Sequence, residues 1–197
     1  MDIAQEINAV SREVRGQTVL VSRGYVAEVE DVWEACTDPE RLARWFMPVT
    51  GDLRPGGHYQ IEGNAGGTIL RCDPPRVLRV SWVFGEMPPS EVEVRLTPVE
   101  GGTRFELEHS NLAEDEHWEQ FGPGAVGVGW DLTIYGLGVQ LAGLRNDPGW
   151  GTSPEAADYM RTSAAAWGAA HEKSGETHER AVAAAERTAS FYAPGGG

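Results

Sequence analysis

His109 is the residue whose type and position best suit chemistry. It ends the run TRFELEH, which begins at Thr103 and alternates polar with apolar side chains. Successive side chains of a strand point to opposite faces, so His109 should share a buried face with Phe105 and Leu107. Two roles stay open for such a histidine. It is either a core residue that bonds a backbone carbonyl or a neighbouring side chain, or a ligand-anchoring or acid/base group with a pKa near neutrality.

Two acidic and histidine-containing patterns do not amount to a metal site. Glu106 and Glu108 adjoin His109, but alternation places them on the opposite face, where a solvated row of carboxylates is expected. His171 is followed by a glutamate, as in the zinc motif H-E-x-x-H, but the position of the second histidine is Gly175. The sequence therefore predicts no metal site.

A glycine pattern near the end of the strand-rich region does not predict a nucleotide site. Gly122, Gly124 and Gly127 match G-x-G-x-x-G, but that fingerprint requires a preceding strand and a βαβ unit, which are absent from the predicted order. No cofactor is expected, and no G-x-S-x-G or paired Cys/His signature supports covalent catalysis. Each glycine in the interior of the predicted helix destabilises that helix by about 1 kcal/mol relative to alanine. Close approach of sheet and helix, or space for a ligand, is the expected compensation.

Three strands and one helix should position these groups. Residues 74–111 read as an antiparallel meander punctuated by Pro and Gly. Its inward face is expected to carry Leu78, Val80, Trp82, Phe84, Val92, Val94, Leu96, Phe105, Leu107 and His109. Residues 126–141 have apolar side chains at three- and four-residue steps, the period of an amphipathic helix, and should cover that face. A curved sheet that grips one helix tends to enclose a pocket.

The rest of the chain adds a strand, two short helices and a helical extension. A first strand over about 18–29 precedes two helices that break at Asp38-Pro39, and strands over 58–62 and 68–72 follow. The order is β-α-α-β6-α, an α+β fold, because the strands come as a run instead of alternating with helices. The predicted segments are a leader over 1–16, a domain over 17–143, a linker over 144–154, an Ala-rich helical hairpin over 155–192 and a frayed tail over 193–197.

Several ordered phrases resemble the START-like (SRPBCC) superfamily. They are VWEA from Val32, TDP from Thr37, RWF from Arg44, LRPGG from Leu53, DPPRVL from Asp73, SW from Ser81 and GTRFELEH from Gly102. More narrowly, residues 17–143 resemble the group named for the activator of the ninety-kilodalton heat-shock-protein ATPase. The phrases GVGWDL from Gly127 and AWG from Ala166 are similar to an actinobacterial branch of this group.

The resemblance implies a helix-grip fold, in which the sheet wraps the long helix over a hydrophobic cavity. It implies no shared catalytic set, since members include lipid carriers, polyketide cyclases and aromatases, hormone receptors and co-chaperones. The expected wall residues are Trp45, Phe46, Tyr59, Ile61, Trp82, Phe84, Phe105, Leu107, His109, Trp130, Ile134 and Leu137. The alternative is that these side chains simply fill the core.

Composition limits the partners. The 197 residues include 30 acidic and 16 basic ones, for a net charge of −14. Nucleic acid and anionic membrane surfaces would repel such a chain, so neither is expected to bind it. Cys36 and Cys72 lack metal-type spacing, and no apolar run has the length of a membrane span, which together predict a cytoplasmic protein. The C-terminal helices should pack on the domain or on a second copy, which would make a homodimer.

The sequence favours a binding protein over an enzyme. Burial of apolar ligand surface supplies affinity without a special motif, so a small hydrophobic molecule such as a lipid, polyketide or aromatic metabolite is the expected ligand. One alternative is a polyketide cyclase or dehydratase that uses His109 in the same cavity to move protons. Another is a co-chaperone-like activator of an ATPase.

Overall fold

The fold is that of a computed structural model, which describes residues 2–145, 147 and 149–193. Its elements are α1 (Ile3–Asn8), β1 (Val10–Arg15), β2 (Thr18–Tyr25), α2 (Val29–Thr37), α3 (Pro39–Trp45), β3 (Val49–Gly51), β4 (His58–Ile61), β5 (Gly66–Asp73), β6 (Val77–Trp82), β7 (Ser90–Val99), β8 (Gly102–Ser110), α4 (Glu116–Phe121), α5 (Gly124–Leu141), the 3-10 turn η1 (Trp150–Thr152), α6 (Pro154–Lys173) and α7 (His178–Tyr192). None of the described helices is both long and apolar enough to cross a membrane.

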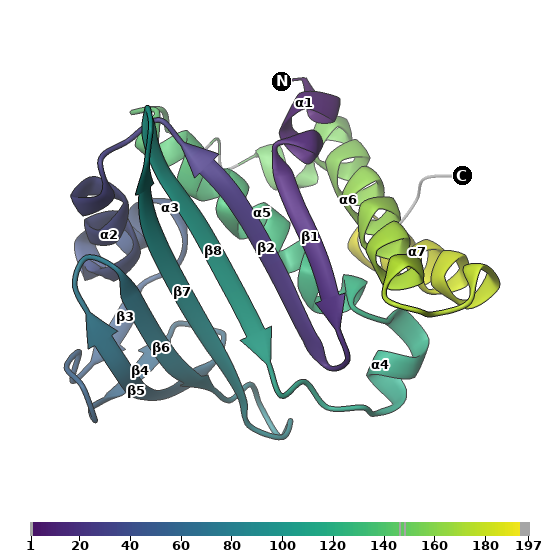
Figure 1. The fold of residues 1–197 in the computed structure, drawn as a ribbon, viewed down its shortest axis with the longest axis horizontal. Helices are drawn as coiled ribbons and strands as arrows, with labels where there is room; N and C mark the ends of the chain where they lie inside the picture. The colour runs from purple at the N-terminus through teal and green to yellow at the C-terminus, as the bar shows by residue number, and fades with distance from the viewer. Residues whose placement is uncertain (1, 146, 148, 194–197) are drawn as a thin grey trace. The chain divides into compact units, whose positions relative to one another are not determined.

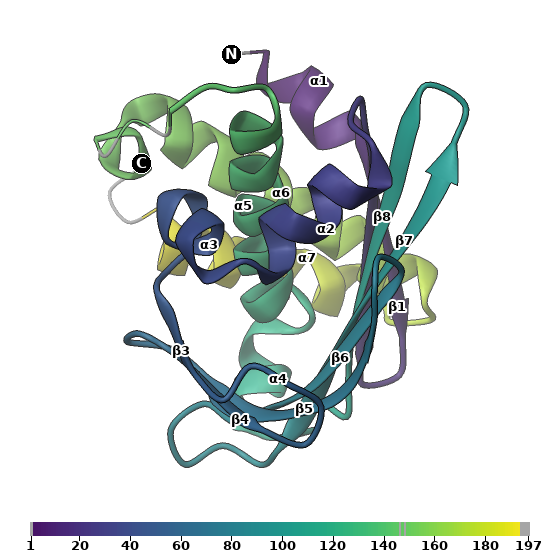
Figure 2. The same ribbon diagram turned by 90° about the vertical axis from the view of Figure 1, so that its left-hand side faces the viewer.

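The chain divides into two compact units, and Figure 1 labels the helices and strands of both. The helical unit comprises Met1–Val21, Glu114–Tyr135 and Asp147–Gly197, and the sheet unit comprises Ser22–Ala113 and Gly136–Asn146. Within the sheet unit the strands curve, and α2 and α3 lie on their concave side (Figure 2). Strand β2 and helix α5 each contribute residues to both units.

Eight strands form one sheet in the order β1-β2-β8-β7-β6-β5-β4-β3. The series β2, α2, α3, β3 to β8 and α5 confirms the predicted β-α-α-β6-α order and the α+β class. The sequence predicts a helical or frayed leader over residues 1–16, whereas Val10–Arg15 form strand β1. Val10 and Val14 are the buried residues of this strand, and two valines four residues apart are too weak a local signal to identify it.

The inner side of β6, β7 and β8 consists of rows of side chains fixed by the strand register. Leu78 lies opposite Val94, which lies opposite Leu107, and Val80 lies opposite Val92, which lies opposite His109. A third row begins with Trp82 opposite Ser90. The alternation predicted for these strands is therefore confirmed as far as Trp82.

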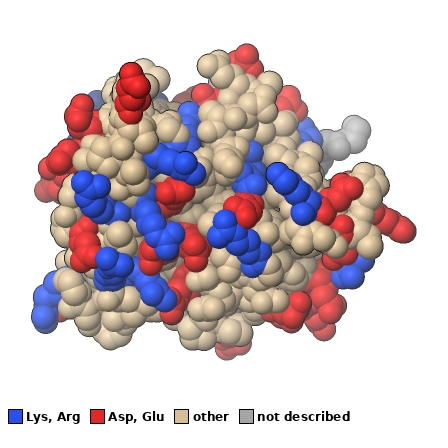
Figure 3. Space-filling model, in the orientation of Figure 1, with Lys and Arg blue, Asp and Glu red and all other residues tan. Residues whose placement is uncertain are grey.

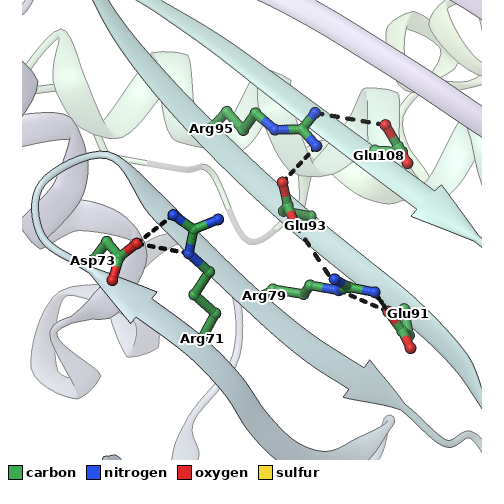
Figure 4. Close-up of polar contacts among 7 residues, drawn as sticks. All are labelled: Arg71, Asp73, Arg79, Glu91, Glu93, Arg95 and Glu108. Carbon is green, nitrogen blue, oxygen red and sulfur yellow. Dashed lines mark hydrogen bonds and ion pairs between the residues drawn. The ribbon is translucent and has the colours of Figure 1, made fainter. Parts of the chain in front are cut away.

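The outer side of β5 to β8 carries charges that pair with one another, and Figure 3 shows both signs interspersed there. Figure 4 shows Arg71 with Asp73, Arg79 with Glu91 and Glu93, and Arg95 with Glu93 and Glu108. Glu106 also pairs with Arg104, at 3.0 Å. The glutamates are thus on the face opposite His109, as alternation predicts, and there they pair with arginines. Each exposed pair contributes at most about 1 kcal/mol.

Helices α6 and α7 pack within their own chain, in the helical unit, where the sequence predicts a helical hairpin. The ring of Trp167 lies over Gly127, where a Cβ atom would fall 2.3 Å from it. Thr188 lies against Gly124 and donates a hydrogen bond to the carbonyl of Phe121 at 3.1 Å. The lack of a side chain at Gly124 and Gly127 therefore leaves space for the C-terminal helices. The sequence suggests instead that this space serves the sheet or a ligand. The homodimer stays a prediction, and the predicted tail beyond Ala193 lies outside the described residues.

A buried carboxylate joins three elements of the helical unit. Asp131 is the only charged side chain of α5 and is fully buried. Its Oδ2 accepts hydrogen bonds from Nε of Arg12 on β1 at 2.8 Å, and from Oγ of Ser163 and Nε1 of Trp167 on α6 at 2.5 and 3.2 Å. Burial raises the pKa of Asp131, whereas Arg12 and the two α6 donors oppose this rise. The carboxylate therefore fixes α6 and β1 to α5.

Candidate ligand-binding site

A buried pair of polar side chains lies on the inner face of the sheet unit. His109 is 3% exposed, and its Nε2 lies 2.8 Å from Oγ of Ser90. The Ser90 hydroxyl also bonds to the carbonyl oxygen of Trp82 at 3.2 Å. Because a hydroxyl has one hydrogen, donation to Trp82 requires Nε2–H of His109 to donate to Ser90. The neutral ring then carries its lone pair on Nδ1.

An aromatic side chain completes this polar corner. The Trp82 ring lies edge to face with the His109 ring, with centroids 6.0 Å apart. Burial lowers the pKa of His109 to about 4, so the ring is neutral at pH 7. A neutral imidazole beside a hydroxyl and an indole makes this corner polar but uncharged, so it offers no positive charge to a carboxylate.

Stability should consequently fall as the pH drops from 6.5 towards 4. In this window the unfolded chain carries a proton on His109, whose ordinary pKa is 6.5, while the folded protein binds that proton only near about 4. Since the unfolded state binds more protons, acid favours unfolding, by about 3 kcal/mol over the whole window. Urea unfolding at pH values above, within and below it measures this loss.

The control for this pH dependence is the His109→Gln variant, which has no group that titrates at this position. Its free energy of unfolding should depend less steeply on pH. The difference in free energy of unfolding between the variant and the natural protein should therefore change by about 3 kcal/mol across the window. Parallel curves for the two proteins would show that His109 is protonated equally in the folded and unfolded states.

Apolar side chains continue the inner face on the neighbouring strands. Tyr59, Ile61 and Ile69 form a buried cluster, and the partly buried residues packed against it are Phe46, Met47, Val49, Cys72, Leu78, Val80 and Trp82. The Tyr59 hydroxyl donates to the carbonyl of Ser81 at 2.8 Å, so its polar end is satisfied within the sheet. Trp82 connects this cluster to the polar corner at His109.

The predicted wall residues fall into different places. Trp45 packs on Phe46, with centroids 5.6 Å apart, and its Nε1 donates to the carbonyl of Ala35 at 3.0 Å. Phe84 is 48% exposed, because β6 ends at Trp82 and the alternation that predicts an inward position stops there. The structure thus corrects the placement of Phe84.

The other predicted wall residues are buried. Tyr59, Ile61, Phe105, Leu107 and His109 are buried on the strands of the sheet unit. Leu137 is buried on the last turns of α5, which belong to the same unit. Trp130 and Ile134 are buried on the part of α5 that belongs to the helical unit. Their role as ligand contacts stays a prediction.

Sequence reasoning missed Ser90. It stands two residues before Val92 and so has the same inward parity, but it follows two prolines and resembles a turn residue. Its register opposite Trp82 makes it the first residue of β7 and brings it to His109. The parity of Val92 extended backwards by one step would have found it.

The curved, open antiparallel sheet with its two short helices and long α5 defines a helix-grip protein of the SRPBCC superfamily. Residues 26–141 match the family model described as Activator of Hsp90 ATPase homolog 1-like protein. The match spans more than half of the chain, so the chain belongs to that family. The resemblance found in the sequence is confirmed.

Solved structures agree with this assignment. CalU16 from Micromonospora echinospora, a crystal structure, is 38% identical with a TM-score of 0.66, and the match covers 83% of this chain and 96% of CalU16. DynU16, from the dynemicin biosynthetic locus, is 23% identical with a TM-score of 0.60 over 68% of this chain and 51% of that one. An Hsp90 activator from Plasmodium falciparum is 23% identical with a TM-score of 0.57, and the match covers 64% of this chain and 97% of that one. The last two similarities show the fold alone. Comparison with curated proteins finds no match.

Proposed function

We propose that the protein binds a small hydrophobic molecule on the inner face of its sheet unit. The observation that carries this proposal is the set of three rows of uncharged side chains on β6 to β8 described above, whose polar members are Ser90 and His109. Apolar surface buried on such a face contributes about 25 cal/mol per Å². The SRPBCC fold is that of a family that binds hydrophobic ligands, which supports the same conclusion.

The polar pair selects the kind of ligand. A site built from apolar walls and a few placed polar groups orients its ligand through those groups. Here they are a hydroxyl and a neutral imidazole, which match an uncharged ligand that carries a polar group. A lipid alcohol, a polyketide or an aromatic ketone meets these requirements, whereas an ionised carboxylate would be buried without a counter-charge.

Replacement of Trp82 by alanine should weaken binding by about tenfold, since it removes an aromatic contact surface. The test uses the neutral fluorescent probe phenylnaphthylamine, titrated into the full chain. The matched control is Phe84→Ala, which removes an exposed ring just beyond the end of β6 and should leave affinity unchanged. Equal losses in the two variants, or no effect of Trp82→Ala on saturable binding, would contradict the proposal.

Co-purified material gives an independent test. Mass spectrometry of the native protein, compared with a denatured and extracted sample, should reveal a neutral apolar compound in stoichiometric amount. A protein that is empty and that binds neither dodecanol nor phenylnaphthylamine would instead have a packed core and a function on its surface.

The enzyme alternative has less support from the environment of His109. A general base works best when its pKa lies near the working pH, and burial lowers the pKa of His109 to about 4. The binding proposal expects His109→Gln to keep affinity within a few-fold. Loss of turnover with intact binding would favour a cyclase or dehydratase.

An ATPase activator, as the family description suggests, would need an interaction surface, and the outer charges of β5 to β8 are already paired with one another.

A further inference from the structure

A hollow in the helical unit has no part in the site described above. It lies between α4 with its flanking residues, the end of α6 and helix α7. Its volume is about 420 Å³, enough for a small organic molecule. Its lining consists of Glu114, Trp118, Glu119, Gly122, His171, Glu176, Glu179, Arg180, Ala183, Ala184 and Arg187. All of these residues belong to the helical unit.

The two arginines of this hollow are already engaged. Nε of Arg180 lies 3.7 Å from Oε2 of Glu176, and Nε of Arg187 donates to the carbonyl of Gln120 at 2.5 Å. Among the described residues, the other three carboxylates of the lining form no ion pair; they are Glu114, Glu119 and Glu179. The hollow therefore has an excess of negative charge.

One aromatic wall and one histidine complete it. The indole of Trp118 lies edge to face with the ring of His171, with centroids 6.2 Å apart. The His171 ring is pressed on Gly122, and its buried Nδ1 has no hydrogen-bond partner in the described part of the chain. Burial lowers the pKa of His171, while Glu176 opposes this effect, so the ring adds no full positive charge at pH 7.

These features discriminate between classes of ligand. An anion would meet four carboxylates and two guanidinium groups, one of which already pairs with Glu176. A metal ion needs several ligands that converge on one point, and within the described residues no three His, Cys, Asp or Glu side chains do so. An organic ammonium ion is larger, attracts carboxylates at a distance and binds the face of an indole through a cation–π interaction.

We propose that this hollow binds a small organic ammonium ion, with Trp118 against the cation and Glu119 and Glu179 supplying the opposite charge. The ligand class is an aliphatic or quaternary amine. This second site is independent of the proposed hydrophobic site, because the two share no residue.

The test is an NMR titration of the isotope-labelled full chain with choline at low salt, where screening is weak. The indole N–H signal of Trp118, assigned by its absence from the Trp118→Phe spectrum, should shift in a saturable manner. The neutral carbon analogue of choline, dimethylbutanol, should bind at least about tenfold more weakly. Methylammonium serves as a smaller cation in case choline is too large.

Paired variants separate specific recognition from overall charge. Glu119→Gln combined with Glu179→Gln should lower the affinity for choline by about tenfold, since the double variant removes one carboxylate on α4 and one on α7. Glu116→Gln combined with Glu186→Gln makes the same charge change on the same helices outside the hollow and should have little effect. Equal losses in the two double variants, equal affinity for the neutral analogue, or no saturable shift with either cation would overturn the proposal.

Discussion

Asp131→Ala is expected to lower the free energy of unfolding by about 3–5 kcal/mol. The substitution leaves the buried guanidinium of Arg12 without its carboxylate, and it leaves the donors of Ser163 and Trp167 without an acceptor. The cost of an unpaired buried charge exceeds the net value of the pair, which is why removal of one partner is so damaging. Urea unfolding followed by circular dichroism measures the change.

The control is Asp158→Ala on α6. Asp158 also pairs with an arginine, Arg161, at 2.9 Å, but both side chains are exposed and the loss should be about 0.5 kcal/mol or less. If Asp131→Ala cost no more than this surface variant, the carboxylate would not hold α6 and β1 to α5.

Ending the chain after Arg145 should have a still larger effect. This truncation removes α6 and α7 and exposes the surface that they bury. It also removes the fully buried side chain of Trp167, whose replacement by alanine alone would cost about 3–5 kcal/mol. Because domains of this kind have only about 5–15 kcal/mol of stability, the shortened protein should lose its cooperative unfolding transition.

Ending the chain after Ala193 is the matched control, because it removes only residues 194–197 and leaves α7 complete. Its unfolding midpoint should equal that of the full chain. A protein ending at Arg145 that kept the same cooperative midpoint would mean that the C-terminal helices are an appendage and not part of the core. Light scattering on the full chain tests the predicted homodimer separately.

Much of the sheet unit could be predicted because a strand has only two faces. Once the apolar side chains of β6 to β8 establish the buried side, alternation places His109 inward and Glu108 outward, and the register confirms both. The prediction was wrong for Phe84, since alternation holds only while the chain stays extended and β6 ends at Trp82. The ordered phrases also identified the family, because several motifs at characteristic intervals are far more specific than any one of them.

The sequence by itself therefore determined the fold class, the inward face of β6 to β8 and the helical nature of residues 154–173 and 178–192. Only the tertiary structure decided that Asp131 meets Arg12, 119 positions away, and that Gly127 makes room for Trp167. The physical reason is one of range. Periodicity and turn chemistry are local properties of the chain, whereas ion pairs and close contacts depend on which distant surfaces pack together.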